Sequence, residues 1–219
     1  NKLLSSARID IVWVPEATKK ITLDGDLSDW PGKPLKLSQE SIMPPDVLNA
    51  KIWKGEKDFS VNFYRAWDEK NLYLAFEVFD DVHHQNDTGR LIYKGDCVQI
   101  GIDPKGNAAP GEEYNGDDYE FGLAQTPKGP QSYCWVPGPD TLKNIKFAVK
   151  RASGRTIYEA AVPWVTLALE DMAADRMFKM GFVVFDRDGA NESTRWIELC
   201  RGVAGGKNPS AFKYFILEK

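Results

Sequence analysis

Acidic residues gather in several short segments, where they could bind a metal ion or form turns. These segments are Asp24-Gly25-Asp26, Asp80-Asp81, Asp117-Asp118 and Asp186-Arg187-Asp188. Calcium prefers carboxylate and carbonyl oxygens, and loops beside strand ends can supply several of them. Aspartate also favours turns, because its side chain bonds the local backbone. Both interpretations stay open for Asp186 and Asp188, whereas turn formation is favoured for the other segments.

The only two histidines are the neighbours His83 and His84. Adjacent side chains on an extended segment point to opposite faces, so the two imidazoles cannot easily share one metal ion. With no third histidine, a zinc site is not expected. We interpret both histidines as surface loop residues.

Aromatic side chains in polar segments are candidates for ligand binding. Tyr93 and Trp135 both lie in such segments and do not need to be part of a core. Their ring faces can stack on the C–H-rich faces of sugars, and their polar edges can form hydrogen bonds. By contrast, Trp67, Trp164 and Trp196 lie in or beside apolar patterns, so we expect them in the core.

Motifs of known catalytic sites are missing from the chain. It has no GxSxG, HExxH, P-loop or GxGxxG sequence. A glycosidase needs two suitably spaced carboxyl groups, and the candidates are Glu112, Glu113, Asp117, Asp118 and Glu120. Because acid-rich loops are common, a binding module is favoured over a hydrolase.

Length and composition indicate a globular protein. The chain has 219 residues, of which 42% are hydrophobic, and it carries a formal net charge of -4. We expect a single domain over residues 1–219. The negative charge argues against nucleic-acid binding, and no apolar run reaches the ~20 residues that span a membrane. Cys97, Cys134 and Cys200 could form one bridge plus a free thiol, or remain three thiols.

Short alternating segments separated by turn residues predict an antiparallel two-sheet β-sandwich. Two pairs of strands, 61–67 with 72–79 and 147–151 with 156–162, have the pattern of hairpins. One short helix is expected after Pro163, over residues 165–174. Further strands are predicted at 97–103, 119–123, 180–185, 195–199 and 212–217.

Several of these segments together resemble carbohydrate-binding module family 9. Residues 21–30 are similar to its opening I-x-I-D-G-x-x-D-x-x-W, 66–74 to its W-D-x-x-x-L-Y hairpin, and 96–103 to D-x-V-E-I-x-I-D. Similar motifs follow in the family's order, and the resemblance runs from about residue 20 to the end. The further motifs are Asp80-Asp81, 118–121, 158–164 and 181–186.

The resemblance implies a jelly-roll-like β-sandwich with structural calcium, and we expect the ligands among Asp24, Asp186 and Asp188. It also implies a non-catalytic module that binds the end of a saccharide. Such a module would belong to an extracellular or periplasmic protein, for example as an accessory module of a larger glycoside hydrolase.

Sugar-binding members of this family hold a terminal sugar between two aromatic rings, with charged and amide groups around its hydroxyls. By resemblance Tyr93 is one ring, and Gln99 takes the place of a glutamate. Gly122 stands where the family has an arginine. The second tryptophan is missing around 205–210, so Trp135 is a candidate replacement. The predicted contacts are Tyr93, Gln99, Trp135, Glu120 and Asn208, with Tyr93 as the platform of a weak site nearer millimolar than micromolar affinity.

Two other functions remain open. Haem-binding periplasmic electron-transfer domains of the same superfamily use Met and Lys axial ligands, and Met43, Met172, Met177 and Met180 are the methionines here. Met180 begins a strand, which favours core packing over haem binding. The other alternative is a structural or interaction domain that has lost sugar binding, as the missing arginine and tryptophan would suggest.

Overall fold

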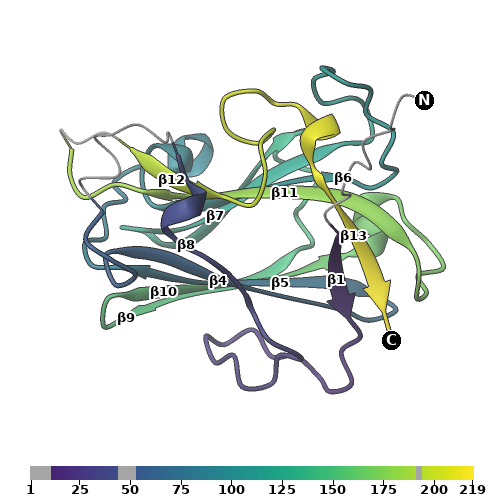
Figure 1. Cartoon of the computed structure of the whole chain (residues 1–219), viewed down its shortest axis with the longest axis horizontal. Coiled ribbons are helices and arrows are strands. Elements are labelled where there is room, and N and C mark those ends of the chain that lie inside the picture. Colours follow the sequence, from purple (N-terminus) through teal and green to yellow (C-terminus); the bar gives the residue numbers. More distant parts are fainter. Residues whose placement is uncertain (1–10, 44–52, 191–193) are drawn as a thin grey trace, which may run out of the picture.

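The computed structural model describes residues 11–43, 53–190 and 194–219, which form two stacked β-sheets (Figure 1). Thirteen strands make up one sheet of eight and one of five. Neighbouring strands are antiparallel except for the pair of β1 (Ile11–Pro15) and β13 (Lys213–Glu218), which are parallel. The predicted antiparallel two-sheet β-sandwich is therefore confirmed.

The five-stranded sheet is built around the two predicted hairpins. In the hairpin of β4 (Phe59–Trp67) and β5 (Asn71–Asp80), the Asp68 carboxylate accepts hydrogen bonds from the backbone N–H groups of Lys70 and Asn71 and closes the turn. Residues 16–34 cross the outer face of this sheet, where buried Trp30 donates its indole N–H to Glu159 at 3.0 Å. The strand order is β2 (Leu35–Leu37), β4 (Phe59–Trp67), β5 (Asn71–Asp80), β10 (Arg155–Pro163) and β9 (Lys146–Ala152).

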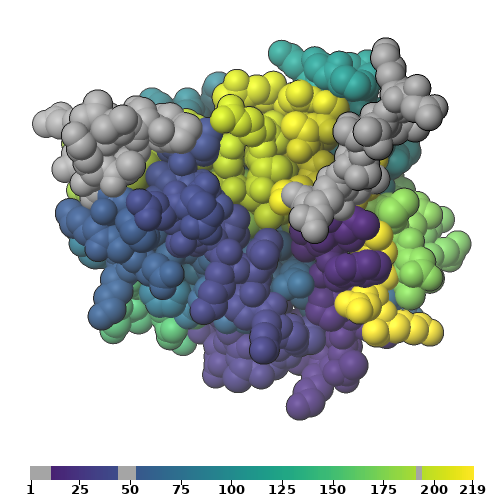
Figure 2. Space-filling model, viewed as in Figure 1, coloured from purple at the N-terminus to yellow at the C-terminus, as the bar shows by residue number. Residues whose placement is uncertain are grey.

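The eight-stranded sheet carries both ends of the described chain. Strand β1 lies at its edge, parallel to β13, and the two run side by side on the surface in Figure 2. The path through this sheet is β1 (Ile11–Pro15), β13 (Lys213–Glu218), β11 (Met177–Asp186), β6 (Cys97–Asp103), β7 (Tyr119–Thr126) and β8 (Gly129–Val136). Strand β12 (Arg195–Glu198) pairs with the other half of β11 and with β3 (Ile42–Met43).

The core between the sheets is rich in phenylalanine. Phe63 and Phe76 of the smaller sheet meet Phe182 of the larger one, with ring centroids 4.7 and 4.9 Å apart. These side chains are fully buried, because alternation along each strand turns one residue in two toward the partner sheet. Met180 is also fully buried, as predicted, whereas Met177 is exposed.

Strand β8 was not predicted, and its position at the sheet edge explains why. Its sequence opens with Gly129 and Pro130, and among its residues only Cys134 is buried. An edge strand with little burial lacks the clean apolar alternation that identifies a half-buried strand. Trp135, which the sequence placed only in a polar segment, therefore lies on a strand.

The predicted helix over 165–174 is wrong. The structure has instead a single 3-10 turn, η3 (Trp164–Leu167), which ends at Ala168 with a left-handed φ of 52°. Leu167 and Leu169 are both buried although they are two residues apart. That spacing suits an extended chain and places them on different sides of a helix.

Candidate functional site

A cavity of about 650 Å³ opens on the outer face of the larger sheet. Strands β6, β7 and β11 contribute residues from the middle of the sheet, and β8 and β12 contribute residues from either side of them. The segment 203–207 and Tyr93 of the 3-10 helix η2 (Gly89–Lys94) add further walls. The cavity is thus bounded by elements that are distant in sequence.

Outward-facing glycines allow aromatic rings to lie directly on this part of the sheet. A Cβ atom at Gly122 would lie 2.8 Å from the Trp135 ring, and one at Gly101 would lie 2.5 Å from the Phe212 ring. Gly101 pairs with Gly181 across β6 and β11. Without side chains at these positions, the rings pack against backbone.

One side of the cavity is an aromatic group on β8 and η2. The Trp135 ring lies 6.4 Å from Tyr93 and 5.4 Å from Tyr133, measured between centroids. Its indole N–H donates to the Arg90 carbonyl at 3.0 Å. A register shift between Glu120 and Phe121 leaves Trp135 without a partner in β7. Trp135 is held in place, and Tyr93 remains 40% exposed.

A second aromatic group lies on the other side, on β12 and β11. The Trp196 and Phe185 rings are 5.9 Å apart, and both line the cavity. Trp196 was expected in the core, and that prediction is wrong: it is half-buried. Ile197 occupies the core instead, so alternation turns Trp196 outward. Trp67 and Trp164 are buried as predicted.

Polar side chains complete the lining. Gln99 of β6 pairs with Gly122 of β7, and Glu120 lies one row further along. The Glu120 carboxylate forms an ion pair with the Lys207 ammonium. Tyr114 adjoins them, and burial, followed by the Glu120 charge, raises the pKa of its phenol, which keeps it a hydrogen-bond donor.

The structure brings four of the five predicted sugar contacts together. Tyr93, Gln99, Glu120 and Trp135 all line the cavity. Asn208 does not: its side-chain oxygen accepts a hydrogen bond from the Ser210 backbone at 3.1 Å and caps the 3-10 helix η4 (Pro209–Ala211). Trp196 and Lys207 were missed.

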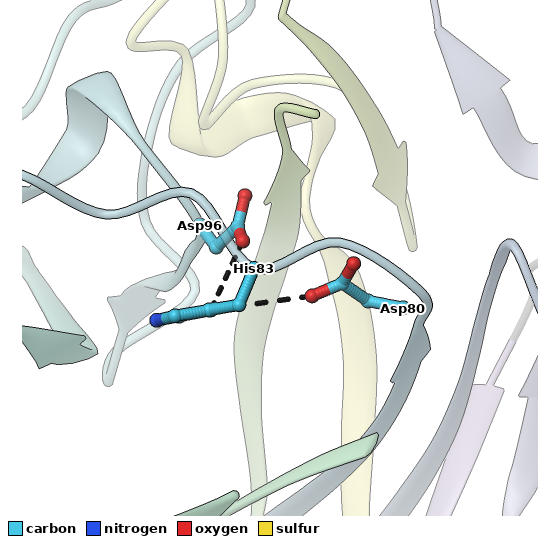
Figure 3. A group of neighbouring side chains, drawn as sticks. All are labelled: Asp80, His83 and Asp96. Carbon is cyan, nitrogen blue, oxygen red and sulfur yellow. Dashed lines mark ion pairs between the residues drawn. The ribbon is translucent and has the colours of Figure 1, made fainter. Parts of the chain in front are cut away.

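A second polar cluster lies between the two sheets at the ends of β5 and β11. Figure 3 shows His83 between Asp96 and Asp80, with Nδ1 at 3.0 and 4.0 Å from their carboxylate oxygens. His83 is thus part of a half-buried ion-pair group and more than a surface loop residue. Burial opposes its charged form, but Asp96 and the Gln125 carbonyl raise the pKa of His83. Burial, with the Asp96 charge, raises the pKa of Asp80 to about 6.

Asp186 and Arg195 form the deepest part of this cluster. The Arg195 guanidinium contacts Asp186, Asp58 at 3.1 Å and Asp188 at 3.5 Å. Burial raises the pKa of Asp186 to about 8 against the lowering effect of Arg195. Oxygens of Asp80, Asp186 and Asp188 lie within 4.8 Å of one another.

The third predicted metal ligand lies elsewhere. Asp24 is exposed, and its carboxylate accepts the Asp26 backbone N–H at 2.9 Å, which is a turn contact. Its carbonyl accepts a hydrogen bond from Lys150 of β9. The structure therefore brings Asp186 and Asp188 together and leaves Asp24 apart from them.

The expectations about the cysteines and about membrane-spanning segments can also be compared with the structure. The three cysteines are free thiols, with Cys97 and Cys134 buried. Within the described residues, no helix is long and apolar enough to cross a membrane.

Comparisons with known proteins agree with this geometry. Residues 38–219 match the family described as "Carbohydrate family 9 binding domain-like". No curated protein sequence matches the chain.

Solved structures share the fold at low sequence identity. A carbohydrate-binding module family 9 protein from Caldicellulosiruptor kristjanssonii in complex with cellotriose has a TM-score of 0.70 and 18% identity, covering 95% of this chain and 94% of that one. The glucose complex has a TM-score of 0.67 at 18% identity, with coverages of 95% and 96%. A putative carbohydrate-binding protein from Bacteroides uniformis ATCC 8492 has a TM-score of 0.55 and 13% identity, with coverages of 96% and 100%.

Proposed function

Since the chain belongs to the carbohydrate family 9 binding domain-like family, we propose that it is a non-catalytic module that binds the end of a saccharide. The observation that carries this proposal is the pair of aromatic groups, Tyr93 with Trp135 and Phe185 with Trp196, on two sides of one cavity. Aromatic faces bind the apolar faces of sugar rings, and a few polar groups then fix the orientation.

The polar lining suits sugar hydroxyls. Gln99 offers both an amide donor and a carbonyl acceptor, Glu120 offers carboxylate acceptors, and the Tyr114 phenol offers a donor. Walls on several sides, including residues 203–207, favour the end of a saccharide chain over its middle.

The positions and pairing of the acidic residues favour binding without catalysis. Among the five candidate acids, only Glu113 and Glu120 line the cavity. Glu120 is held in an ion pair with Lys207, and Glu113 is exposed. A glycosidase needs a general acid that carries a proton for the leaving group, and an ion pair with Lys207 does not suit Glu120 to that role. We also propose a role as accessory module of a larger glycoside hydrolase, outside the cell or in the periplasm, which membership of this family supports.

Calcium is proposed as a structural ion near Asp80, Asp186 and Asp188. An all-carboxylate donor set suits a hard cation. Asp186 is 1% exposed, and its Oδ1 has no hydrogen-bond partner among the residues that the structure describes. Arg151 and Arg195 offset only part of the charge of the buried Asp58, Asp80, Asp96 and Asp186 together with Asp188.

Titration calorimetry with glucose and cellotriose, the ligands of the similar structures, tests the sugar proposal. We expect saturable heat with both, since either presents a sugar end to the cavity. A wider panel of plant, algal and bacterial saccharides extends the test to other sugars. Failure of every saccharide on that panel to bind would contradict the proposal.

Thermal unfolding in calcium and in chelator tests the ion. Calcium at a hundredfold excess over its dissociation constant would stabilise the native state by about 2.7 kcal/mol if it bound only that state. Identical melting temperatures in the two buffers would contradict calcium binding by Asp186 and Asp188.

A further inference from the structure

We propose that Glu120 and Lys207 make the cavity selective for uncharged saccharides and exclude uronic acids. This inference rests on the proposed carbohydrate function and specifies the class of sugar. It concerns two charged residues that line the cavity, of which Lys207 could not be recognised from the sequence.

Glu120 is buried yet only half satisfied. It is 1% exposed and lines the cavity. One carboxylate oxygen pairs with Lys207, and the other, Oε2, makes no hydrogen bond within the described part of the chain, although the equally unpaired Tyr114 phenol adjoins the carboxylate. A buried polar atom without a partner is costly, so a ligand that supplies one gains affinity. Because an ionised carboxylate only accepts hydrogen bonds, the matching ligand group must be a donor, such as a sugar hydroxyl.

The charge of the lining points in the same direction. Lys207 is the one cation among the described residues that line the cavity, while Glu113 and Glu120 are both acidic. A uronate would bring another carboxylate close to Glu120 in a partly desolvated site, where like charges repel strongly. A neutral hexose presents a hydroxymethyl group instead, which can donate a hydrogen bond.

Lys207 cannot readily serve a uronate instead. Moving its half-exposed ammonium away from Glu120 to a ligand carboxylate would leave Glu120 buried without its ion-pair partner, which is strongly unfavourable. The backbone of this segment is also fixed: the Asn208 N–H donates to the Gly202 carbonyl at 2.8 Å, and Val203 is fully buried. The pair therefore acts as one neutral unit in the cavity lining, with Glu120 Oε2 as its one unpaired acceptor.

Calorimetry with glucose and sodium glucuronate at equal pH and ionic strength tests this inference, because the two sugars differ only in replacing a hydroxymethyl group by a carboxylate. We expect the wild type to bind glucose at least tenfold more tightly. Glu120→Gln keeps the side-chain size, removes the negative charge and frees Lys207, so it should reduce this preference at least fivefold. Glu69→Gln, at an exposed position outside the cavity lining, is the matched control and should change it by less than twofold.

Equal affinities of the wild type for both sugars, or an unchanged ratio in Glu120→Gln, would overturn this inference alone. Absence of binding to all saccharides would overturn the proposed function as well, so the two failures are distinguishable. If Glu120→Gln does not fold, the double variant Glu120→Gln with Lys207→Met removes both charges together. The preference should then also be lost, and its persistence would count against the inference.

Discussion

Trp135 can pack closely against the sheet because Gly122 has no side chain at the point of contact. A Cβ atom there would approach the Trp135 ring to 2.8 Å and the Val98 carbonyl to 2.9 Å. Real Cβ atoms do not approach other atoms so closely, so either the ring or the strand must move. The position of one aromatic wall therefore depends on a residue that is not part of the cavity lining.

Gly122→Ala should consequently weaken sugar binding at least tenfold, or about 1.4 kcal/mol, because it displaces Trp135. Calorimetry of the variant measures this loss, and near-UV circular dichroism reports the changed tryptophan environment. Gly116→Ala is the control, since a Cβ there meets no atom within 4 Å. An unchanged affinity in Gly122→Ala would mean that the Trp135 position does not matter.

Trp196→Ala should also reduce sugar affinity by tenfold or more, since large aromatic residues commonly dominate binding energy. The matched control is Trp13→Ala, which removes a 47% exposed tryptophan of β1 that does not line the cavity. Equal effects of the two substitutions would show that Trp196 acts only through general stability. Tyr93→Ala belongs in the same series, because Tyr93 was the platform predicted from sequence.

The sequence revealed some of these residues and concealed others for physical reasons. Tyr93 and Trp135 stand out because aromatic residues in polar segments have no core to join. Trp196 is hidden because its neighbours are apolar, although strict alternation from Ile197 would have placed it on the outer face. Lys207 gives no local signal, since its role depends on Glu120, which is distant in the chain.

Strands proved easier to predict than helices in this chain. The β4–β5 and β9–β10 hairpins were recognised because each strand has one face in the core and a turn signal follows. The edge strand β8 and the 3-10 turn η3 were not, because neither has a periodic apolar pattern of its own. Tertiary contacts decide the structure of such elements.

The backbone conformation of the β9–β10 turn can be tested by substitution. Ser153 and Gly154 form a two-residue loop with φ values of 52° and 74°. Such loops favour Asn-Gly, because asparagine tolerates positive φ better than serine. Ser153→Asn should therefore stabilise the protein by about 0.5 kcal/mol, which raises the melting temperature by about 1–2 °C.

Ser153→Val provides the opposite change, because a β-branched residue is strained at positive φ. Thermal unfolding should rank the variants as asparagine, serine, valine from most to least stable. Sugar affinity should not change in either variant, since the turn lies outside the cavity lining. A valine variant as stable as the wild type would contradict the conformation assigned to this turn.

At the scale of the whole molecule, the acid cluster joins the two sheets. Asp80 ends β5 of the smaller sheet, while Asp186 ends β11 of the larger one. Arg195 of β12 reaches both Asp186 and Asp58, which precedes β4. These residues come from separate segments, so the sequence could mark Asp186 and Asp188 as candidates but could not supply Asp80 as their neighbour.

This cluster should make the protein less stable as the pH rises. Paired carboxylates usually have the opposite effect, because they lose stability as the pH falls. The pKa of Asp186 is about 8 in the folded protein and 3.8 as an ordinary value, so between these pH values the folded state binds more protons. The free energy of unfolding then falls as pH rises from about 4 to about 8. The raised pKa values of Asp80 and His83 act in the same direction.

We therefore expect the protein in chelator to melt at a higher temperature at pH 5.5 than at pH 8. Asp186→Asn should flatten this dependence, because the amide does not titrate, while Asp140→Asn at an exposed position should leave it unchanged. Calcium should flatten it as well in the wild type, since a bound cation takes the place of the proton and stabilises the ionised carboxylate. Calorimetric melting curves of the three proteins at both pH values, with and without calcium, measure each effect. A wild type that gains stability steadily up to pH 8 in chelator would show that Asp186 is ionised at low cost, and the argument for a cation at this junction of the two sheets would then fail.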